Sequence, residues 1–245
     1  MMSTSPQLAL VTGAGSGIGK AIAAQLAQNG YKVIIADIRL EAAQRVMSGL
    51  VEMGLQAQAV AIDITDSRAV ATLIDKLPPL QILVNNAGIF NVKAFFDLCE
   101  EDFRQMYEVN TISVFTLSRL AAKKMPAGGR IINIASRSML GAKEYVHYAT
   151  SKIAVAGLTR SMALELAQKH ITVNAVSPGV IETDMLKARS DTDLDHLRTL
   201  QPMGELGSPQ HIAHTVAFLA HPQAQFITGQ VLMVDGGRSI TTASF

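Results

Sequence analysis

The chain has 245 residues, of which 49% are hydrophobic and 5% aromatic, and its formal net charge is +1. This length encloses a full hydrophobic core, and a core of Ala, Val, Ile and Leu suits helices packed on a parallel sheet. Acidic and basic residues are dispersed without a basic stripe, which argues against nucleic acid or an anionic membrane as a partner.

Cysteine usage and the start of the chain indicate the compartment. Cys99 is the only cysteine, so neither an intrachain disulfide nor a multi-cysteine zinc site can form. Residues 1–6 lack the charged and apolar regions of a signal peptide, and no apolar run approaches the roughly 20 residues that span a bilayer. We therefore expect a cytoplasmic protein without a metal site.

Short apolar runs alternate with longer amphipathic runs along the chain. This alternation predicts βαβ units with right-handed crossovers, which build an α/β, Rossmann-type, doubly wound parallel sheet with helices on both faces. No linker or repeat interrupts the pattern, so we expect a single domain over residues 1–245. The predicted strands are 8–12, 32–36, 57–62, 81–85, 130–135, 172–176 and 231–234, which makes a seven-stranded sheet; the predicted helices are 17–29, 41–53, 66–76, 101–124, 145–169 and 209–220.

The first predicted strand ends in a glycine-rich stretch, Thr12-Gly-Ala-Gly-Ser-Gly-Ile-Gly19, that opens the first helix. Glycines permit a tight turn there and let backbone N–H groups approach a pyrophosphate at the helix N-terminus. Because this stretch joins a strand to a helix near the start of the chain, it favours dinucleotide binding.

The second strand is followed by Asp37, 18 residues after Gly19. A carboxylate there accepts hydrogen bonds from both hydroxyls of an adenosine ribose and repels a 2′-phosphate, which favours NAD over NADP. Arg39 complicates this prediction, because a guanidinium two residues further on can pair with a 2′-phosphate.

Polar residues also follow the third and fourth strands. Asp63, before Ile64, is placed to meet the adenine amino group, although it could instead cap the helix that follows near Asp66. The stretch Asn85-Asn-Ala-Gly88 suits a tight turn in which side chains bond to the backbone.

Tyr148 and Lys152 lie four residues apart in the predicted helix 145–169. Four residues are about one helical turn, so the two side chains project from the same face. By itself this spacing does not distinguish a solvated helix face from a catalytic pair.

The order of these pieces resembles the short-chain dehydrogenase/reductase family over almost the full length of the chain. The matching pieces are Thr12-Gly-x-x-x-Gly-Ile-Gly19, Asp63, Asn85-Asn-Ala-Gly88, Asn110, Ser136, Tyr148-x-x-x-Lys152, Asn174 and Pro178-Gly179. Each piece alone is a weak signal, but their shared order favours the functional interpretation of Tyr148 and Lys152.

The resemblance implies a role for four catalytic residues. Tyr148 would exchange a proton with the substrate oxygen, and the Lys152 ammonium, together with a positive nicotinamide ring, would lower its pKa from near 10. Ser136 would hold the substrate oxygen through its hydroxyl. Asn110, an unfavourable residue inside a helix, would hold a water molecule that links Lys152 to solvent.

The motifs and the resemblance also give a set of expected cofactor contacts between residues 13 and 183. They are Gly13, Gly15, Ser16, Gly17, Ile18, Gly19, Asp37, Asp63, Ile64, Asn86, Ala87, Gly88, Tyr148, Lys152, Pro178, Gly179, Ile181 and Thr183. Residues 183–208 form no clear element, and we expect this segment to cover the substrate, since a long loop in a compact domain is often a lid.

The serine assignment has a competitor. Ser136 follows the strand 130–135 directly, whereas Ser138 stands ten residues before Tyr148. We place Ser136 in the catalytic role. The connection up to Tyr148 then carries four polar candidates for substrate contact, which are Arg137, Lys143, Glu144 and His147.

The resemblance implies an NAD(P)-dependent enzyme that moves a hydride between nicotinamide and a secondary alcohol or ketone. Asp37 favours NAD(H) and a small sugar, polyol or hydroxy acid. The alternative is a 3-oxoacyl-[acyl-carrier-protein] reductase using NADPH, against which Asp37 and Ser16 weigh, because those reductases often carry a basic residue in place of Ser16. A remote alternative is a non-catalytic dinucleotide-binding protein, which would not need all four catalytic side chains.

The family is usually dimeric or tetrameric, with the helices that carry Asn110 and Tyr148 forming one subunit interface. The last strand, 231–234, commonly builds another. We therefore expect a homotetramer, or else a homodimer, that binds a small-molecule alcohol or ketone.

Overall fold

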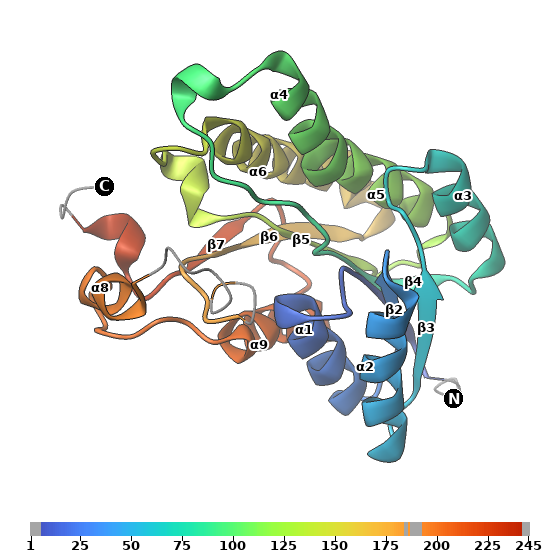
Figure 1. Ribbon diagram of the computed structural model, residues 1–245. Coiled ribbons are helices and arrows are strands. Elements are labelled where there is room, and N and C mark those ends of the chain that lie inside the picture. The colour runs from blue at the N-terminus through green and yellow to red at the C-terminus, as the bar shows by residue number, and fades with distance from the viewer. Residues whose placement is uncertain (1–5, 184–185, 187–192, 242–245) are drawn as a thin grey trace.

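The structure, a computed structural model, describes residues 6–183, 186 and 193–241. Within them, seven parallel strands form one sheet in the order β3-β2-β1-β4-β5-β6-β7 (Figure 1). Most strands are runs of buried aliphatic residues, as expected for a sheet that is covered on both faces. The strands are β1 (Leu8–Thr12), β2 (Lys32–Asp37), β3 (Ala57–Ala61), β4 (Leu80–Asn85), β5 (Arg130–Ile134), β6 (Thr172–Pro178) and β7 (Val231–Val234).

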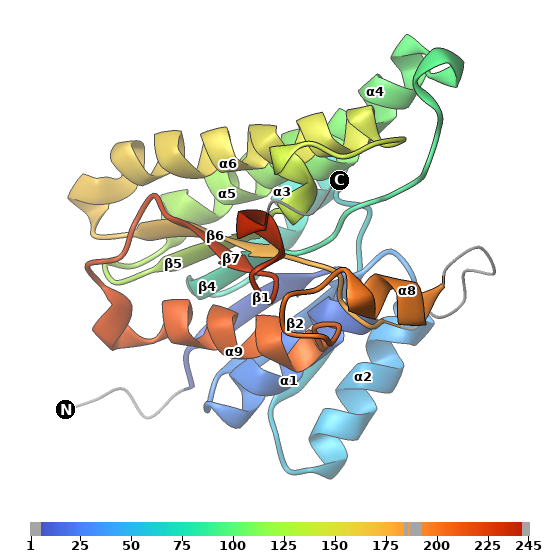
Figure 2. The same ribbon diagram turned by 90° about the vertical axis from the view of Figure 1, so that its left-hand side faces the viewer.

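Helices cover both faces of the sheet (Figures 1 and 2). One face carries α1 (Gly17–Gln28), α2 (Leu40–Glu52) and α9 (Pro209–Ala220). The opposite face carries α3 (Ser67–Lys76), α5 (Ser113–Lys124) and α6 (Val146–Leu166), and α4 (Glu100–Tyr107) precedes α5. The short helix α8 (Leu194–Thr199) lies beyond the carboxyl ends of the strands.

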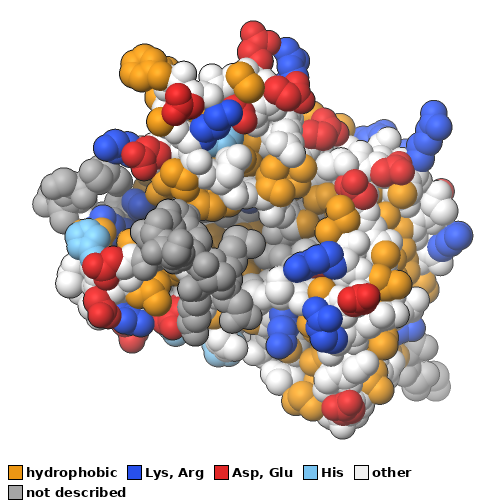
Figure 3. All heavy atoms as spheres, in the orientation of Figure 1, with side chains coloured by type: hydrophobic (Ala, Val, Ile, Leu, Met, Phe, Trp, Pro, Cys, Tyr) orange, Lys and Arg blue, Asp and Glu red, His pale blue; other side chains and the backbone are white. Residues whose placement is uncertain are grey.

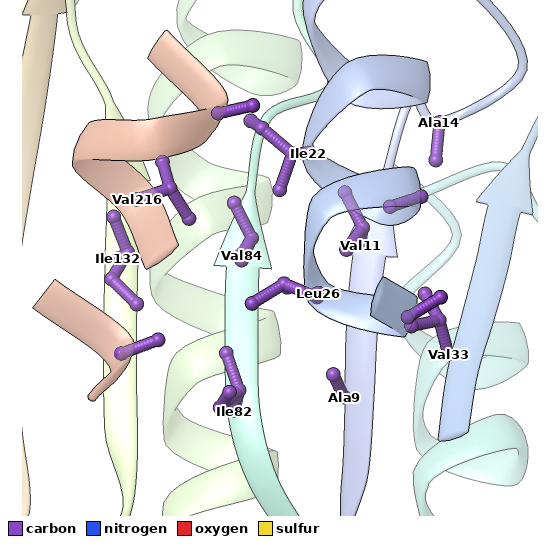
Figure 4. Close-up of a cluster of buried hydrophobic side chains, with 14 of the residues drawn as sticks. Ala9, Val11, Ala14, Ile22, Leu26, Val33, Ile82, Val84, Ile132 and Val216 are labelled. Carbon is purple, nitrogen blue, oxygen red and sulfur yellow. The ribbon is translucent and has the colours of Figure 1, made fainter. Parts of the chain in front are cut away.

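The core on the α1 side is made of small and aliphatic side chains, drawn in Figure 4. Ile22 and Leu26 of α1 are fully buried and pack, with Val216 of α9, against the aliphatic residues of β1, β4 and β5. Truncating a buried leucine such as Leu26 to alanine costs about 2–5 kcal/mol of unfolding free energy. This packing fixes α1, and therefore the turn before it, against the sheet.

The strand order reverses at β1, which pairs with β2 on one side and β4 on the other. At such a reversal the following helices depart to opposite faces, which opens a crevice outside the carboxyl ends of the strands. The turns after β1, β2 and β4 carry the glycines, Asp37 and the Asn86 turn, so the topology brings these segments together.

The predicted fold class is confirmed, and most element boundaries differ by one or two residues. The predicted helix 101–124 is found as one helical run, but it consists of α4 and α5 with a π-helical segment, Glu108–Ile112, between them. A π segment adds one residue to the turn, which a pattern of 3.6-residue periodicity does not reveal. The predicted loop 182–208 also contains α8, whose polar sequence carries no clear apolar stripe.

Candidate functional site

An open cleft of about 1700 Å³ lies at the carboxyl ends of the strands. Figure 3 looks onto this face, where hydrophobic side chains border a hollow in the surface. Two candidates, Gly15 and Asn110, are not part of the cleft wall. The candidates that line it are Gly13, Ser16, Gly17, Ile18, Gly19, Asp37, Asp63, Ile64, Asn86, Ala87, Gly88, Ser136, Tyr148, Lys152, Pro178, Gly179, Ile181 and Thr183.

The turn between β1 and α1 requires glycine. Gly13 and Gly17 have φ angles of +63° and +53°, and a Cβ on Gly13 would lie 2.8 Å from the Cα of Ala87. A Cβ on Gly19 would collide with the carbonyl oxygen of Gly13. Ser16 is the N-cap of α1 but makes no side-chain hydrogen bond to it. The turn thus presents the positive end of α1, with its N–H groups, to the cleft.

A buried threonine, the first residue of the glycine-rich stretch, braces this turn, and the sequence alone assigned it no role. The Thr12 hydroxyl accepts hydrogen bonds from the N–H groups of Asn86 (3.0 Å) and Ala87 (3.1 Å). The Asn86 side-chain amide donates back to the carbonyl oxygens of Thr12 (2.9 Å) and Gly13 (3.1 Å). The Asn86 side chain therefore holds the glycine turn in place. The sequence feature that indicated Thr12 was a polar residue at the end of an apolar strand.

The Asp37 carboxylate is buried and held on both oxygens. Oδ2 accepts a hydrogen bond from the Gly15 N–H at 2.9 Å, and Oδ1 accepts one from the Arg39 N–H at 3.0 Å. The Arg39 side chain is mostly exposed, and its Nε lies 3.8 Å from Oδ1. A Cβ on Gly15 would lie 2.7 Å from Oδ2, so glycine at this position lets the backbone approach the Asp37 carboxylate.

Asp63 does not cap the helix that follows. Its Oδ1 accepts hydrogen bonds from the N–H (2.9 Å) and the hydroxyl (2.7 Å) of Thr65, which lower the pKa of the Asp63 carboxyl. The N-cap of α3 is Asp66, which accepts from the N–H groups of Arg68 and Ala69. Asp63 and Ile64 line the cleft beside Asp37, as the adenine prediction requires.

Tyr148 and Ser136 meet across the cleft floor. Tyr148 is in the first turn of α6, and Ser136 follows β5 as the N-cap of the 3₁₀ helix Arg137–Leu140. A hydrogen bond from the Ser136 hydroxyl to the Tyr148 oxygen favours the phenolate. The competitor, Ser138, is buried beneath Ser136, with its Oγ 2.9 Å from the Ser136 Oγ.

The expected effect of Lys152 on Tyr148 is not found in the protein alone. Burial raises the pKa of Tyr148 above 10.0, and the Ser136 hydrogen bond only partly offsets this increase. Lys152 is also buried, and the loss of hydration lowers its pKa to about 8. Its Nζ donates to the carbonyl oxygen of Ile134 at 2.9 Å and lies 5.8 Å from the Tyr148 ring.

Asn110 lies in the π segment and is 1% exposed. Its amide pairs with the backbone of Ile89, accepting from the N–H at 2.9 Å and donating to the carbonyl at 3.0 Å, and it also donates to the Ser151 hydroxyl. A Cβ on Gly88 would lie 2.9 Å from Asn110 Oδ1 and 3.5 Å from Lys152 Nζ, so Gly88 lets these groups approach. Asn110 is therefore a buried, hydrogen-bonded residue and not an exposed polar position on a helix surface.

The end of β6 supplies the remaining wall. Pro178, Gly179, Ile181 and Thr183 line the cleft in sequence. Asn174 instead faces the loop before β7: its Nδ2 donates to the Ile227 carbonyl at 2.7 Å, and its Oδ1 accepts from the Gln230 N–H at 3.1 Å. Part of the expected substrate loop, residues 184–185 and 187–192, lies outside the described residues.

An aromatic wall adjoins Tyr148, and sequence reasoning missed it. The Phe90 ring meets the Tyr148 ring edge to face, with 4.9 Å between centroids, and meets Tyr145 at 5.3 Å. Ile89 and Val92 also line the cleft, and all three side chains of this segment are more than one third exposed. The only sequence signal was an apolar stretch directly after Gly88, where a loop is usually polar.

Of the four polar candidates on the connection before Tyr148, only Glu144 lines the cleft. It has a φ of +69°, a strained angle for a residue other than glycine. His147 is fully buried and bonded to Asn91, as expected for a residue that does not share the Tyr148 face. Among the described residues, no cluster of His, Cys, Asp and Glu could hold a metal ion, and no helix is long and apolar enough to cross a membrane.

The chain is similar in sequence to a known protein family. Residues 13–239 match the sequence model of a family described as enoyl-(acyl carrier protein) reductase. A 3-oxoacyl-[acyl-carrier-protein] reductase from Vibrio cholerae is 40% identical over 243 residues, which cover 96% of this chain and 98% of the reductase.

Two solved structures superpose closely. A short-chain dehydrogenase/reductase from Serratia marcescens is 38% identical with a TM-score of 0.89, covering 95% of this chain and 98% of its own. A 7α-hydroxysteroid dehydrogenase in complex with NADH and 7-oxo glycochenodeoxycholic acid is 40% identical with a TM-score of 0.89, covering 94% of this chain and 93% of its own.

Proposed function

The chain belongs to the short-chain dehydrogenase/reductase family, and we propose that it is an NAD(H)-dependent enzyme that interconverts a secondary alcohol and a ketone. The observation that carries this proposal is the placement of Tyr148, Ser136 and Lys152 in the same cleft as the glycine turn and Asp37. A protein that only binds a dinucleotide would need the second group and not the first.

The residues of the cleft fit a dinucleotide. Side chains at Gly13 and Gly88 would collide with Ala87 and Asn110, so glycine keeps these turns close-packed beside the cleft, and α1 directs its N-terminus at the same region. The glycine turn would hold the pyrophosphate, Asp37 the adenosine ribose, and Lys152 the nicotinamide ribose. The bound nicotinamide would supply the hydride for ketone reduction or accept it in alcohol oxidation.

We propose NAD(H) over NADP(H) because of the buried Asp37 carboxylate, since a 2′-phosphate beside it would face like charge. Arg39 offers the opposing attraction, but it lies at 3.8 Å from that carboxylate with an exposed side chain. Ser16 contributes no positive charge. The NADH-bound hydroxysteroid dehydrogenase among the similar structures supports the same choice.

The residues around the reacting oxygen suit proton transfer. Tyr148 is a phenol at neutral pH because the ordinary pKa of tyrosine is near 10 and burial raises it further, so it can donate a proton to the oxygen of a ketone that is being reduced. Ser136 would donate a hydrogen bond to that oxygen and stabilise its developing negative charge. Lys152 has a pKa of about 8 and is therefore mostly protonated at pH 7.

The substrate that the cleft favours carries an apolar ring beside its carbonyl group. Phe90 and Tyr145 form an aromatic corner at Tyr148, and Ile89 and Val92 extend it with side chains that are exposed within the cleft. Apolar surface that lines a cleft is suited to apolar ligand surface. The sugar, polyol or hydroxy acid expected from the sequence remains a competing prediction, because such a substrate would need several polar partners.

A 3-oxoacyl-[acyl-carrier-protein] reductase is the second candidate function. The favourable observation is the exposed Arg39 at the cleft, next to the position of a 2′-phosphate, together with the 40% identity to the Vibrio cholerae enzyme. Asp37 and Ser16 oppose it for the reasons given above.

Two experiments separate these functions. Nicotinamide fluorescence should show NADH binding at least about tenfold tighter than NADPH, which is about 1.4 kcal/mol. NADH-linked reduction should then be fastest with 2-tetralone or 2-decalone, slower with acetoin, and slowest with fructose and acetoacetyl thioesters. Tighter NADPH binding with acetoacetyl thioester turnover would assign the second function, and fructose turnover above that of 2-tetralone would restore the polyol substrate.

We further propose a homotetramer, or else a homodimer, in which α5 and α6 form one subunit interface. Ile112, Phe115 and Ile153 are exposed apolar side chains on the helical region that carries Asn110 and Tyr148. Exposed apolar side chains gathered on one face are typical of an interface. Sedimentation equilibrium tests this, and an Ile153→Glu variant should dissociate whereas a Val51→Glu variant, at an exposed apolar position on α2, should not.

A further inference from the structure

A second serine hydroxyl is buried directly behind Ser136. Ser138 is 6% exposed, its Oγ lies 2.9 Å from the Ser136 Oγ, and its backbone N–H donates to the same oxygen at 3.2 Å. The sequence leaves these two serines as competitors for one catalytic role. In the structure Ser136 lines the cleft, and Ser138 contacts it from the protein side.

The two contacts restrict what Ser136 can do. A hydroxyl has one proton to donate and two lone pairs that accept. With the Ser138 hydroxyl as the donor of the 2.9 Å contact, Ser138 fills both lone pairs, one with its N–H and the other with its hydroxyl, which leaves the Ser136 proton for another acceptor. The Tyr148 hydroxyl, which lines the same cleft as Ser136, offers such an acceptor.

We propose that Ser138 is a positioning residue that makes Ser136 an obligate hydrogen-bond donor toward the substrate oxygen. Without the Ser138 hydroxyl, the Ser136 hydroxyl retains a free lone pair and can rotate away from the cleft. This inference rests on the proposed function, because it assigns a direction to the hydrogen bond that stabilises the reacting oxygen.

The competing interpretation is that Ser138 only shapes the turn. Ser136 is the N-cap of the 3₁₀ helix Arg137–Leu140, and the cap needs the backbone N–H of Ser138 but not its hydroxyl. Ser138→Ala therefore keeps the cap and removes only the second contact. The other titratable groups near Tyr148 stay in place. The Lys152 Nζ lies 5.8 Å from the Tyr148 ring centroid, and the Tyr145 ring centroid lies 6.4 Å from it.

The test is a double-mutant cycle on kcat for the ketone that the wild type reduces fastest with NADH. Ser138→Ala should lower kcat about tenfold, as for one lost hydrogen bond, with NADH affinity and KM within about twofold of wild type. Ser136→Ala should lower kcat by about 100-fold. Because Ser138 acts through Ser136, the double variant should match Ser136→Ala alone.

Two further variants control for packing. Ser138→Thr keeps the hydroxyl and should retain at least about half of the wild-type kcat. Ser177→Ala removes another fully buried serine hydroxyl, one without a hydrogen-bond partner among the described residues, and should leave kcat within about twofold.

The outcomes separate the inference from the function on which it rests. A wild type that reduces no ketone would overturn both. An active wild type with an equally active Ser138→Ala variant would overturn only the inference, as would a double variant about tenfold slower than Ser136→Ala, because that loss would not pass through Ser136.

Discussion

The cleft has two ends that are built differently. At the glycine end, which comprises residues 13–19, 37 and 86–88, each key group is tied by short hydrogen bonds between turns that directly follow strands, such as Gly15 to Asp37 and Asn86 to Thr12. At the tyrosine end, which comprises residues 89–92, 136–148 and 193–197, the wall consists of longer connections whose rings meet edge to face.

The two ends differ in how much their sequence and length can change. Strand ends and their turns hold one geometry, which suits a ligand with a fixed shape such as a dinucleotide. Connections between elements tolerate change in length and composition, which suits substrate selection. We therefore expect substitutions at the glycine end to act on cofactor affinity and those at the tyrosine end to act on substrate choice.

The largest expected effect on cofactor affinity is that of Gly13→Ala at the glycine end. The new Cβ would lie 2.8 Å from the Cα of Ala87 on a residue with a φ of +63°. An L-residue in that conformation costs about 1–2 kcal/mol before the clash is counted. We expect NADH affinity, followed by fluorescence, to fall by at least about 100-fold.

The matched control is Gly49→Ala within α2, where no atom lies within 4 Å of the added Cβ and φ is not positive. Its NADH affinity should stay at the wild-type level, and its melting temperature should hold or rise, because alanine favours a helix. Wild-type affinity in Gly13→Ala would contradict the account of a turn that only glycine permits.

Lys152→Met should reveal the cost of a buried charge next to the tyrosine end. Burial lowers the pKa of Lys152 from 10.5 to about 8. Below pH 8 the lysine is charged in both states, so the whole cost, about 3 kcal/mol, is present. Between pH 8 and 10.5 the folded chain loses its proton before the unfolded chain does, so wild-type stability rises relative to the variant.

The measurement is urea unfolding of wild type and Lys152→Met at pH 7 and pH 9.5. The free energy of unfolding of the wild type should gain about 2 kcal/mol on that of the variant between these two pH values. A difference that does not change with pH would mean that the lysine keeps an ordinary pKa.

Asp37→Asn should shift the cofactor preference, and it also gives up one of the two hydrogen bonds from the Gly15 and Arg39 N–H groups, because an amide nitrogen does not accept. The amide carries no charge to repel a 2′-phosphate, so the ratio of NADPH to NADH affinity should rise by about tenfold, or about 1.4 kcal/mol. Asp75→Asn, an exposed position on α3, serves as the control and should leave the ratio unchanged. An unchanged ratio in Asp37→Asn would remove the main argument for NAD(H).

The smallest effect is expected from Phe90→Leu at the tyrosine end. Leucine keeps the apolar character but loses the ring edge against Tyr148, so kcat/KM for 2-tetralone should fall by about three- to tenfold, as for one aromatic contact. Turnover of acetoin and affinity for NADH should stay within about twofold. Phe218→Leu, on an exposed position of α9, is the control. Equal losses for both ketones would show that Phe90 acts on Tyr148 and not on the substrate.

The same division explains what the sequence could predict. The alternating apolar runs predicted the sheet, because buried parallel strands differ sharply from amphipathic helices. The glycine turn and the Tyr148–Lys152 pair were also readable, since each depends on a fixed local spacing.

What the sequence could not predict depends on contacts between distant segments. The π segment that buries Asn110 is a one-residue irregularity, and the ring contacts of Phe90 join segments more than 50 residues apart. The raised pKa of Tyr148 likewise follows from burial, which spacing does not report.

The most direct test of the central claim compares wild type with Tyr148→Phe for NADH binding and NADH-linked ketone reduction. Phenylalanine keeps the ring against Phe90 and removes only the hydroxyl. The account predicts NADH affinity within about twofold of wild type and a loss of kcat of at least about 1000-fold, as for removal of the acid that donates the proton. A Tyr148→Phe variant that still reduces the ketone at a similar rate would contradict the assignment of Tyr148 as the acid.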